Sequence, residues 1–293
     1  MIINKIKLIL GSPHFLIAFF LFIFILGAMT LSEQRKLLNS NTWKSLEPGL
    51  DLGIFPCPSS HGETCEINIL RINPAFFELR LLNTSASKEG MPLTARQWCK
   101  ENNLVAAINA SMYQQDIKTS VSLMKTKGHV NNPRLSKDKA ILAFDRRSSK
   151  VPKVQIIDRE CQNFHKVKEN YRTLVQSIRM VSCKGRNVWR QQKKKFSIAS
   201  VGIDKKGNVL FIHVQNPLTP YDLINILLKL PISIKKAMYV EGGSESQLFV
   251  QSHGQEFEFM GIYEAFFIEP GSVLLPRPVP NVIGVVRADK IEK

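Results

Sequence analysis

The sequence predicts an α+β protein: a single domain with a long mixed β-sheet core and packed helices, behind an N-terminal hydrophobic helix. Three observations support this prediction. An uncharged apolar stretch, rich in Phe, lies near the N-terminus. Short apolar runs of β-favouring residues recur along the rest of the chain, and only two segments carry clear helix-start signals. The chain has no internal repeat, and its 293 residues suit one large domain or two small ones behind the leader.

The N-terminal residues have the layout of a signal sequence. Lys5 and Lys7 supply positive charge with no acidic residue beside them, and residues 15–29 are all apolar or glycine. This run is short for a membrane span of about 20 residues, and its last three residues, GAM, form a poor cleavage site. We therefore expect residues 1–30 to be an uncleaved signal anchor, with a cleaved signal peptide as the alternative.

The remaining chain divides into a short connection and the domain. Residues 31–64 are polar and contain Pro and Gly turns, which predicts a tether and lead-in, and residues 65–287 then form the domain. The expected strands cover residues 67–72, 76–82, 104–108, 141–144, 198–203, 209–214, 237–240, 247–250, 257–260 and 282–286. We expect the first two of these runs to be adjacent strands. Residues 171–181 fit either a helix or a strand.

Two helix starts are well marked. Thr94 and Gln97 have the spacing of a capping box, which predicts a helix to about residue 102. Thr219 fits an N-cap that is followed by Pro220 at the first helical position and by Asp222 in the first turn. Both signals place a helix directly beside an apolar strand.

The chain is strongly basic, with a formal net charge of +16. Such a charge favours anionic partners, and an exported chain does not meet nucleic acid, so we expect none there. The remaining partners are membrane headgroups and phosphorylated envelope glycans. A generally basic proteome is the alternative explanation of the charge.

The five cysteines predict two disulfides. Outside the cytoplasm neighbouring cysteines tend to oxidise, so we expect Cys57 to pair with Cys65 and Cys161 with Cys183, which leaves Cys99 free in a helix. The spacing of Cys57, His61 and Cys65 also resembles a zinc site, but it lacks a fourth ligand. We expect no metal and no cofactor.

Two segments deliver polar side chains from the end of an apolar strand into a turn of small residues. The first begins at Asn109, and the second is Glu241-Gly242-Gly243, which continues to Ser246. Sites are commonly built on loops at strand ends, and glycines let backbone amides approach an anion. A carboxyl at the end of a buried strand is partly desolvated, which suits Glu241 to act as a general base or nucleophile. A plain β-turn at the two glycines is the alternative.

These segments resemble motifs of the phosphodiester glycosidase family, also called the uncovering-enzyme type domain. The family carries an N-G-x-[FY]-F-like segment after one strand, here residues 109–113, and a D-G-G-x-S-like segment after another, here residues 241–246. Further similarity to a bacterial branch runs through residues 201–213, 230–243, 261–264 and 280–285, so that the resemblance covers roughly residues 65–287. The chain departs from the family at Glu241, where Asp is usual, at Ala110, where Gly is usual, and at Ile198, where Arg is frequent.

The resemblance implies an exported hydrolase that cleaves a sugar-1-phosphodiester in envelope or extracellular glycans or glycolipids. The domain would lie outside the cytoplasm on a single-pass bacterial inner-membrane anchor, or be secreted or periplasmic if the leader is cleaved. Glu241 is the expected catalytic carboxylate. Further candidate catalytic residues are Asn109, Glu245 and Glu264. Candidate substrate-binding residues are Gly242, Gly243, Ser244, Ser246, Tyr113 and Asp116.

Two other functions compete with this one. Residues 242–246 partly imitate the G-x-S-x-G motif of serine hydrolases, with Ser244 as nucleophile, but His213 and His253 have no obvious acid partner. The second is a non-catalytic, membrane-tethered binder or scaffold for phosphorylated glycans, which the departures from the family motif favour. Whether the protein is an enzyme is therefore left open by the sequence.

Overall fold

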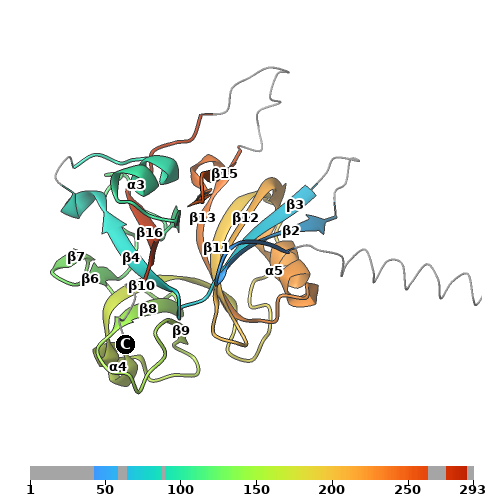
Figure 1. The fold of residues 1–293 in the computed structure, drawn as a ribbon. Coiled ribbons are helices and arrows are strands. Elements are labelled where there is room, and N and C mark those ends of the chain that lie inside the picture. Colours follow the sequence, from blue (N-terminus) through green and yellow to red (C-terminus); the bar gives the residue numbers. More distant parts are fainter. Residues whose placement is uncertain (1–42, 59–64, 88–89, 263–274, 289–293) are drawn as a thin grey trace, which may run out of the picture. The chain divides into compact units, whose positions relative to one another are not determined.

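The computed structural model describes residues 43–58, 65–87, 90–262 and 275–288 (Figure 1). The leader expected at residues 1–30 lies outside these residues, and none of the described helices is long and apolar enough to cross a membrane. The described residues form a single domain dominated by strands, with few helices. The α+β prediction is therefore confirmed only in part.

The larger of two sheets has the strand order β1-β2-β3-β12-β11-β13-β10-β6-β7, and β8 and β9 attach to it through β10. The pairing is antiparallel throughout. Its strands are β1 (Trp43–Glu47), β2 (Leu50–Cys57), β3 (Cys65–Ile72), β6 (Met124–Thr126), β7 (His129–Asn132), β8 (Ala140–Arg146), β9 (Gln155–Asp158), β10 (Tyr171–Val181), β11 (Phe196–Asp204), β12 (Val209–Leu218) and β13 (Ile234–Gly242).

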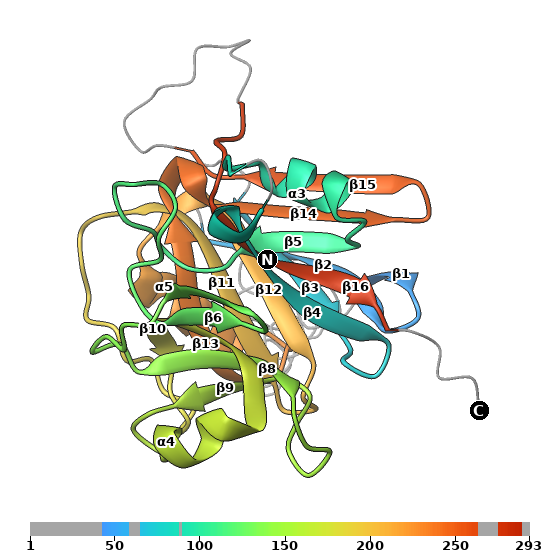
Figure 2. The ribbon, with the colours of Figure 1, turned by 90° about the vertical axis from the view of Figure 1, so that its left-hand side faces the viewer.

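The smaller sheet has the order β15-β14-β5-β16-β4. Its strands are β4 (Phe77–Asn83), β5 (Ala106–Asn109), β14 (Gln247–Ser252), β15 (Gln255–Met260) and β16 (Asn281–Arg287). One hydrophobic cluster joins the two sheets, since it holds Leu79 and Ile108 of the small sheet together with Val201 and Phe211 of the large one. Figure 2 shows the two sheets from the side.

Each principal helix covers the outer face of one sheet. In α5 (Pro220–Lys229), Leu223 and Leu227 pack on the large sheet, and in α3 (Ala95–Glu101), Trp98 packs on the small one. Both helix starts are confirmed: Thr94 and Gln97 form the capping box, and the Thr219 side chain accepts the Asp222 N–H. The other helices among the described residues are single turns: η1 (Thr84–Ala86), α4 (Phe164–Val167), η2 (Lys168–Asn170) and η3 (Gly243–Glu245).

Three local predictions need correction or completion. Residues 43–57, expected to belong to a tether, form β1 and β2, because alternate side chains such as Leu50 and Leu52 are buried and the strand pairs with β3. Residues 171–181 form the strand β10. The runs at 67–72 and 76–82 are both strands, but they lie in different sheets, because the turn at residues 73–76 lets the chain cross between them.

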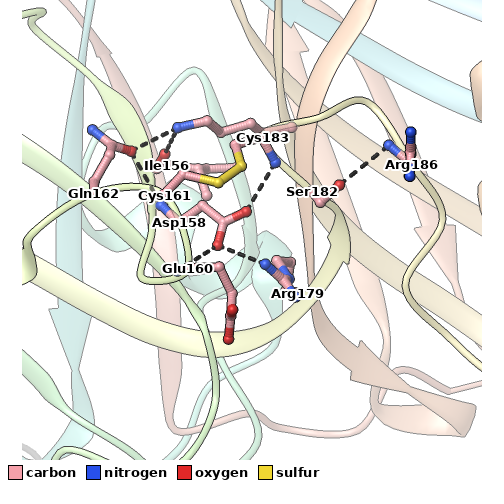
Figure 3. Close-up of a disulfide and its surroundings, with 10 residues drawn as sticks. Ile156, Asp158, Glu160, Cys161, Gln162, Arg179, Ser182, Cys183 and Arg186 are labelled. Carbon is pink, nitrogen blue, oxygen red and sulfur yellow. Dashed lines mark hydrogen bonds and ion pairs between the residues drawn. A yellow bond between two sulfur atoms is a disulfide. The ribbon is translucent and has the colours of Figure 1, made fainter.

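Both expected disulfides are present. Cys57–Cys65 joins β2 to β3 at paired positions, and Cys161–Cys183 joins the loop after β9 to the end of β10. Figure 3 shows Asp158 beneath the second disulfide, where its carboxylate accepts the Cys183 N–H at 2.8 Å and Nη1 of Arg179 at 2.7 Å. Cys99 is free and buried, and this burial raises the pKa of its thiol well above the ordinary value.

Candidate active site

The candidate site lies at the end of β13, where a β-bulge interrupts the pairing with β11. Tyr239 pairs with Ser200 and Glu241 pairs with Ala199, so Val240 is the extra residue between them. A bulge re-aims the side chains around it and is frequent beside active sites. It changes the direction of the strand just before Gly242 and Gly243.

The two glycines are required for different reasons. Gly243 has φ of +70°, a conformation that side chains disfavour. Gly242 has an extended backbone, but a Cβ atom there would overlap the Tyr239 hydroxyl and crowd the Phe196 ring. The turn after β13, which we call the Gly-Gly turn (residues 242–247), therefore depends on one glycine for its backbone and on the other for space.

Asn109 holds this turn in place from the end of β5. Its Nδ2 donates to the Glu245 carbonyl at 2.9 Å, and its Oδ1 accepts the Gln247 N–H at 2.7 Å. The side chain is almost fully buried, at 1 % exposure. Asn109 thus joins the two segments that the sequence singled out, and its side-chain contacts assign it a positioning role.

The other buried contacts also serve the turn. Ser246 is fully buried, and its hydroxyl donates to the Gly243 carbonyl at 2.8 Å. Gly261 approaches so closely that any side chain there would overlap the Gly243 carbonyl, and its N–H donates to the Ser246 carbonyl at 2.8 Å. Ser246 therefore stabilises the turn and does not line an open site.

A cavity of about 280 Å³ opens beside the turn. Its lining consists of Lys194, Lys195, Phe196, Tyr239, Gly242, Gly243, Glu245 and Ile262. Glu245 brings a carboxylate to one part of this lining, and the two lysines bring ammonium groups to another. The cavity thus combines a negative group, two positive groups and the backbone of the two glycines.

Glu241 directly precedes the lining residues Gly242 and Gly243 in the chain, but it is not itself one of the lining residues. Burial, reinforced by the nearby charge of Glu245, raises its pKa to about 8, although the Gly242 N–H donates to Oε1 at 3.0 Å and opposes the shift. Desolvation disfavours the ionised form of a carboxyl. Glu241 therefore carries a proton at neutral pH, which suits a proton donor better than the general base or nucleophile expected from the sequence.

Aromatic side chains form one wall of the cavity. The Tyr239 ring lies 6.2 Å from the Phe196 ring, edge to face, and 5.7 Å from the Trp189 ring, as measured between centroids. Burial and the neighbouring charges of Glu241 and Glu245 raise the pKa of Tyr239. Its hydroxyl therefore stays protonated and can donate a hydrogen bond beside the two carboxyl groups.

Three other predicted site residues have different surroundings. Glu245 forms an ion pair with Arg277, in which Oε1 of Glu245 lies 3.1 Å from Nη1 of Arg277. Asp116 is exposed and closes its own loop, where the hydrogen bond from the Thr119 hydroxyl is the largest cause of its lowered pKa. Tyr113 pairs with Ser120 in an isolated bridge, so neither Tyr113 nor Asp116 is among the cavity-lining residues. Glu264 lies outside the described residues.

The described residues do not assemble a serine-hydrolase triad. His213 is fully buried, and its Nε2 lies 3.4 Å from the hydroxyl of Ser246, not of Ser244. Its Nδ1 and the Ser244 hydroxyl have no hydrogen-bond partner among these residues, so no acid orients the imidazole. Burial lowers the pKa of His213 to about 4, which keeps it neutral inside the protein.

Sequence reasoning missed several residues of this cavity. Lys194 and Lys195 lie in a charge cluster that is typical of a solvated loop, and Tyr239 and Phe196 look like ordinary strand residues. One signal in the sequence could have pointed to them: Ile198 stands where the family often has an arginine, so another residue has to supply the positive charge. Ile198 is buried and pairs with Gly242. The positive charge at the cavity comes instead from the residues that precede β11.

The phosphodiester glycosidase family model matches residues 102–286, which is more than half of the chain. The catalytic domain of zebrafish N-acetylglucosamine-1-phosphodiester alpha-N-acetylglucosaminidase, auto-inhibited by its pro-peptide, has a similar fold, with a TM-score of 0.61, 12 % identity and 84 % coverage of both chains. A hypothetical protein from Synechocystis matches with a TM-score of 0.54 and 14 % identity, over 84 % of this chain and 64 % of that one.

A search among curated proteins found no match. The family model confirms the resemblance seen in the sequence, and such a domain supports a hydrolase that acts on phosphodiester-linked sugars. The protein belongs to the phosphodiester glycosidase family.

Proposed function

We propose that this protein hydrolyses the bond between the anomeric carbon of a sugar and a phosphodiester, in a phosphorylated glycan or glycolipid outside the cytoplasm. The observation that carries the proposal is the distribution of charge in the 280 Å³ cavity. Its lining contains one carboxylate, that of Glu245, and two ammonium groups, those of Lys194 and Lys195. Glycoside cleavage passes through an oxocarbenium-like state, which a carboxylate stabilises. The departing phosphate is negative, which ammonium groups stabilise.

The positive groups and the backbone amides would bind the phosphate. Lys194 and Lys195 are exposed, and neither side chain has a hydrogen bond or ion pair with other described residues. Gly242 and Gly243 line the cavity as well, and the Gly242 N–H contacts the Glu241 carboxyl. This arrangement leaves the lysines available for a ligand.

The two carboxyl groups would divide the proton transfer between them. Glu241 is protonated at neutral pH, whereas Glu245 is ion-paired with Arg277 and lines the cavity. Glu245 would take the proton of the attacking water as its oxygen bonds to the anomeric carbon. The carbon–oxygen bond to phosphate would break as the new bond forms, with its electron pair on the phosphate, which Glu241 protonates. Two carboxyl groups in different environments commonly divide acid and base roles in this way.

The two disulfides support a location outside the cytoplasm, because such bonds persist in oxidising compartments. We propose that residues 1–30 bring the domain there, as a single-pass inner-membrane anchor or as a cleaved leader for a secreted or periplasmic protein. The basic charge of +16 is consistent with an anionic envelope glycan as substrate.

The test is turnover of a panel of sugar-1-phosphodiesters with chromogenic aglycones by the wild type, Glu241→Gln and Glu245→Gln. Glu258→Gln is the matched control, because Glu258 is also ion-paired with an arginine and is outside the cavity lining. Release by the wild type and the control, but not by Glu241→Gln or Glu245→Gln, supports the proposal. Tight binding of these substrates without release by any variant would instead indicate the non-catalytic binder.

A further inference from the structure

A second and larger cleft, of about 760 Å³, runs along β4 at the edge of the small sheet. Six consecutive residues of this strand, 77–82, line it. Because side chains of a strand alternate between the two faces of a sheet, consecutive residues can share one cleft only if the main-chain edge faces it. The cleft shares no lining residue with the Glu245 cavity.

The flanking hydrogen bonds show which main-chain groups face the cleft. β4 pairs with β16 in one continuous antiparallel register, in which the Ala288 N–H donates to the Phe76 carbonyl and the Thr84 N–H to the Pro280 carbonyl, both at 2.8 Å. Bonded pairs in such a ladder recur at every second residue. Even-numbered residues from 76 to 84 therefore face β16, and Leu79 and Leu81 direct their N–H and C=O groups away from it.

These outward groups have no main-chain partner in the described part of the chain, where β4 pairs with β16 alone. Natural proteins usually cover or disrupt such an edge. Here β4 contains no proline and no bulge, and the Leu79 and Leu81 side chains are buried in the core, which holds the edge straight. The two residues present a row of donors and acceptors with a repeat of about 7 Å.

The rim of the cleft is predominantly basic. Arg80 belongs to β4, Lys127 to the β6–β7 turn, Arg146 to the end of β8 and Lys153 to the loop between β8 and β9, and all four line the cleft. Of the two acidic lining residues, Asp145 is ion-paired with Arg172, 3.2 Å away, which leaves only Glu78 to oppose the four cations. Arg80, Lys127 and Lys153 form no hydrogen bond or ion pair with other described side chains.

We propose that the edge of β4 is a strand-addition site for an extended, acidic polypeptide segment of another protein. An added strand satisfies unpaired edge groups at the peptide spacing, and side chains flanking the groove select its charge. A second copy of this chain is a poor occupant, because pairing two β4 edges would bring the basic rims of the two copies together and their positive charges would repel. Residues 31–42 of the chain itself carry Arg35 and Lys36 against a single acid, Glu33, and so lack the complementary charge.

The experiment uses the full-length protein and a fluorescent ten-residue peptide of alternating Glu and Val. Binding is followed by anisotropy, with a Lys-Val peptide and polyphosphate as comparison probes. Leu81→Pro removes the outward N–H at residue 81, which an edge strand tolerates, and Leu81→Ala is its matched control with the N–H retained. Lys127→Glu with Lys153→Glu reverses the rim charge, and Lys166→Glu with Lys206→Glu, at exposed lysines elsewhere, is the charge control.

We expect saturable binding of the Glu-Val peptide alone, weakened about tenfold or more by Leu81→Pro and by the rim reversal, but not by either control. Amide exchange at Leu79 and Leu81 should slow when the peptide is added, since the new strand would protect those N–H groups. Equal binding of the Lys-Val peptide, or indifference to both variants, would overturn the proposal.

Two other outcomes would contradict the proposal and identify a different occupant of the cleft. Polyphosphate binding that is lost on rim reversal but retained in Leu81→Pro would identify an anionic-polymer site and contradict strand addition. Concentration-dependent dimers of the wild type that Leu81→Pro abolishes, without peptide binding, would show that a second copy occupies the edge.

Discussion

The two sides of the candidate catalytic cavity are built differently. The Gly-Gly turn is fixed by buried contacts from Asn109, Ser246 and Gly261, and it carries Glu245. The basic segment, which we define as residues 190–195, is largely exposed, and its cations make no hydrogen bonds or ion pairs with other described side chains.

This contrast matches the two parts of the proposed substrate, the sugar and its phosphate. Bond cleavage at the anomeric carbon requires catalytic groups held within a fraction of an ångström, and a rigid, hydrogen-bonded turn provides that precision. A phosphate is recognised at longer range by its charge, so flexible lysines are sufficient. The rigid side should therefore determine kcat and the exposed side KM.

The largest effect should come from Glu241→Gln, which keeps the shape of the side chain but removes its exchangeable carboxyl proton. We expect kcat to fall by about 10³-fold, within the range for a general acid. In the wild type, kcat should fall as the pH rises through about 8, because the donor then loses its proton. Activity that increases through the same pH range would assign Glu241 as a base instead.

Asn109→Ala should have the next largest effect, because both hydrogen bonds that place the turn would be lost. We expect kcat to fall by about 10²-fold, the scale of a catalytic group misplaced by about 1 Å. Asn102→Ala removes an amide that caps α3 away from the cavity and serves as the control for stability. If both variants lose kcat equally, the loss reflects folding and not the position of the turn.

The exposed side is tested by Lys194→Gln combined with Lys195→Gln. We expect KM to increase about tenfold with kcat changed by less than about threefold, because the lysines would bind phosphate in the ground state as well as in the transition state. The increase of KM with salt should also become shallower. Lys205→Gln with Lys206→Gln, in the β11–β12 turn, should leave KM unchanged.

The smallest effect concerns stability. Burial raises the pKa of Glu241 from 4.5 to about 8, so the folded state binds this proton more tightly than the unfolded chain. Stability associated with the proton is complete below about pH 4.5 and is lost as the pH rises toward 8. The melting temperature of Glu241→Gln relative to wild type should therefore rise by on the order of 10 °C between about pH 5 and about pH 9. An unchanged difference would show that the folded-state pKa is not raised.

Much of the local structure follows from the sequence. The capping box at Thr94, the N-cap at Thr219, the hairpin formed by β11 and β12 and the disulfide pairs each depend on residues close together in the chain, and the structure contains all of them. The two site segments were also identified, since small and polar residues after an apolar strand mark a strand-end loop. Local spacing could not show that β3 and β4 belong to different sheets.

The protonation and the neighbours of the site residues were beyond the sequence, because they depend on burial by strands distant in the chain. The residue pattern by itself determined most of the strands, the two covering helices and the family, but it predicted an α+β fold where the described residues are mostly strands. Only the tertiary structure decided that Asn109 clamps Glu245, that Lys194 and Lys195 face the same cavity, and that Leu79 and Leu81 form an open edge. The physical reason is that backbone propensity is local, whereas desolvation and charge pairing depend on which distant segments meet.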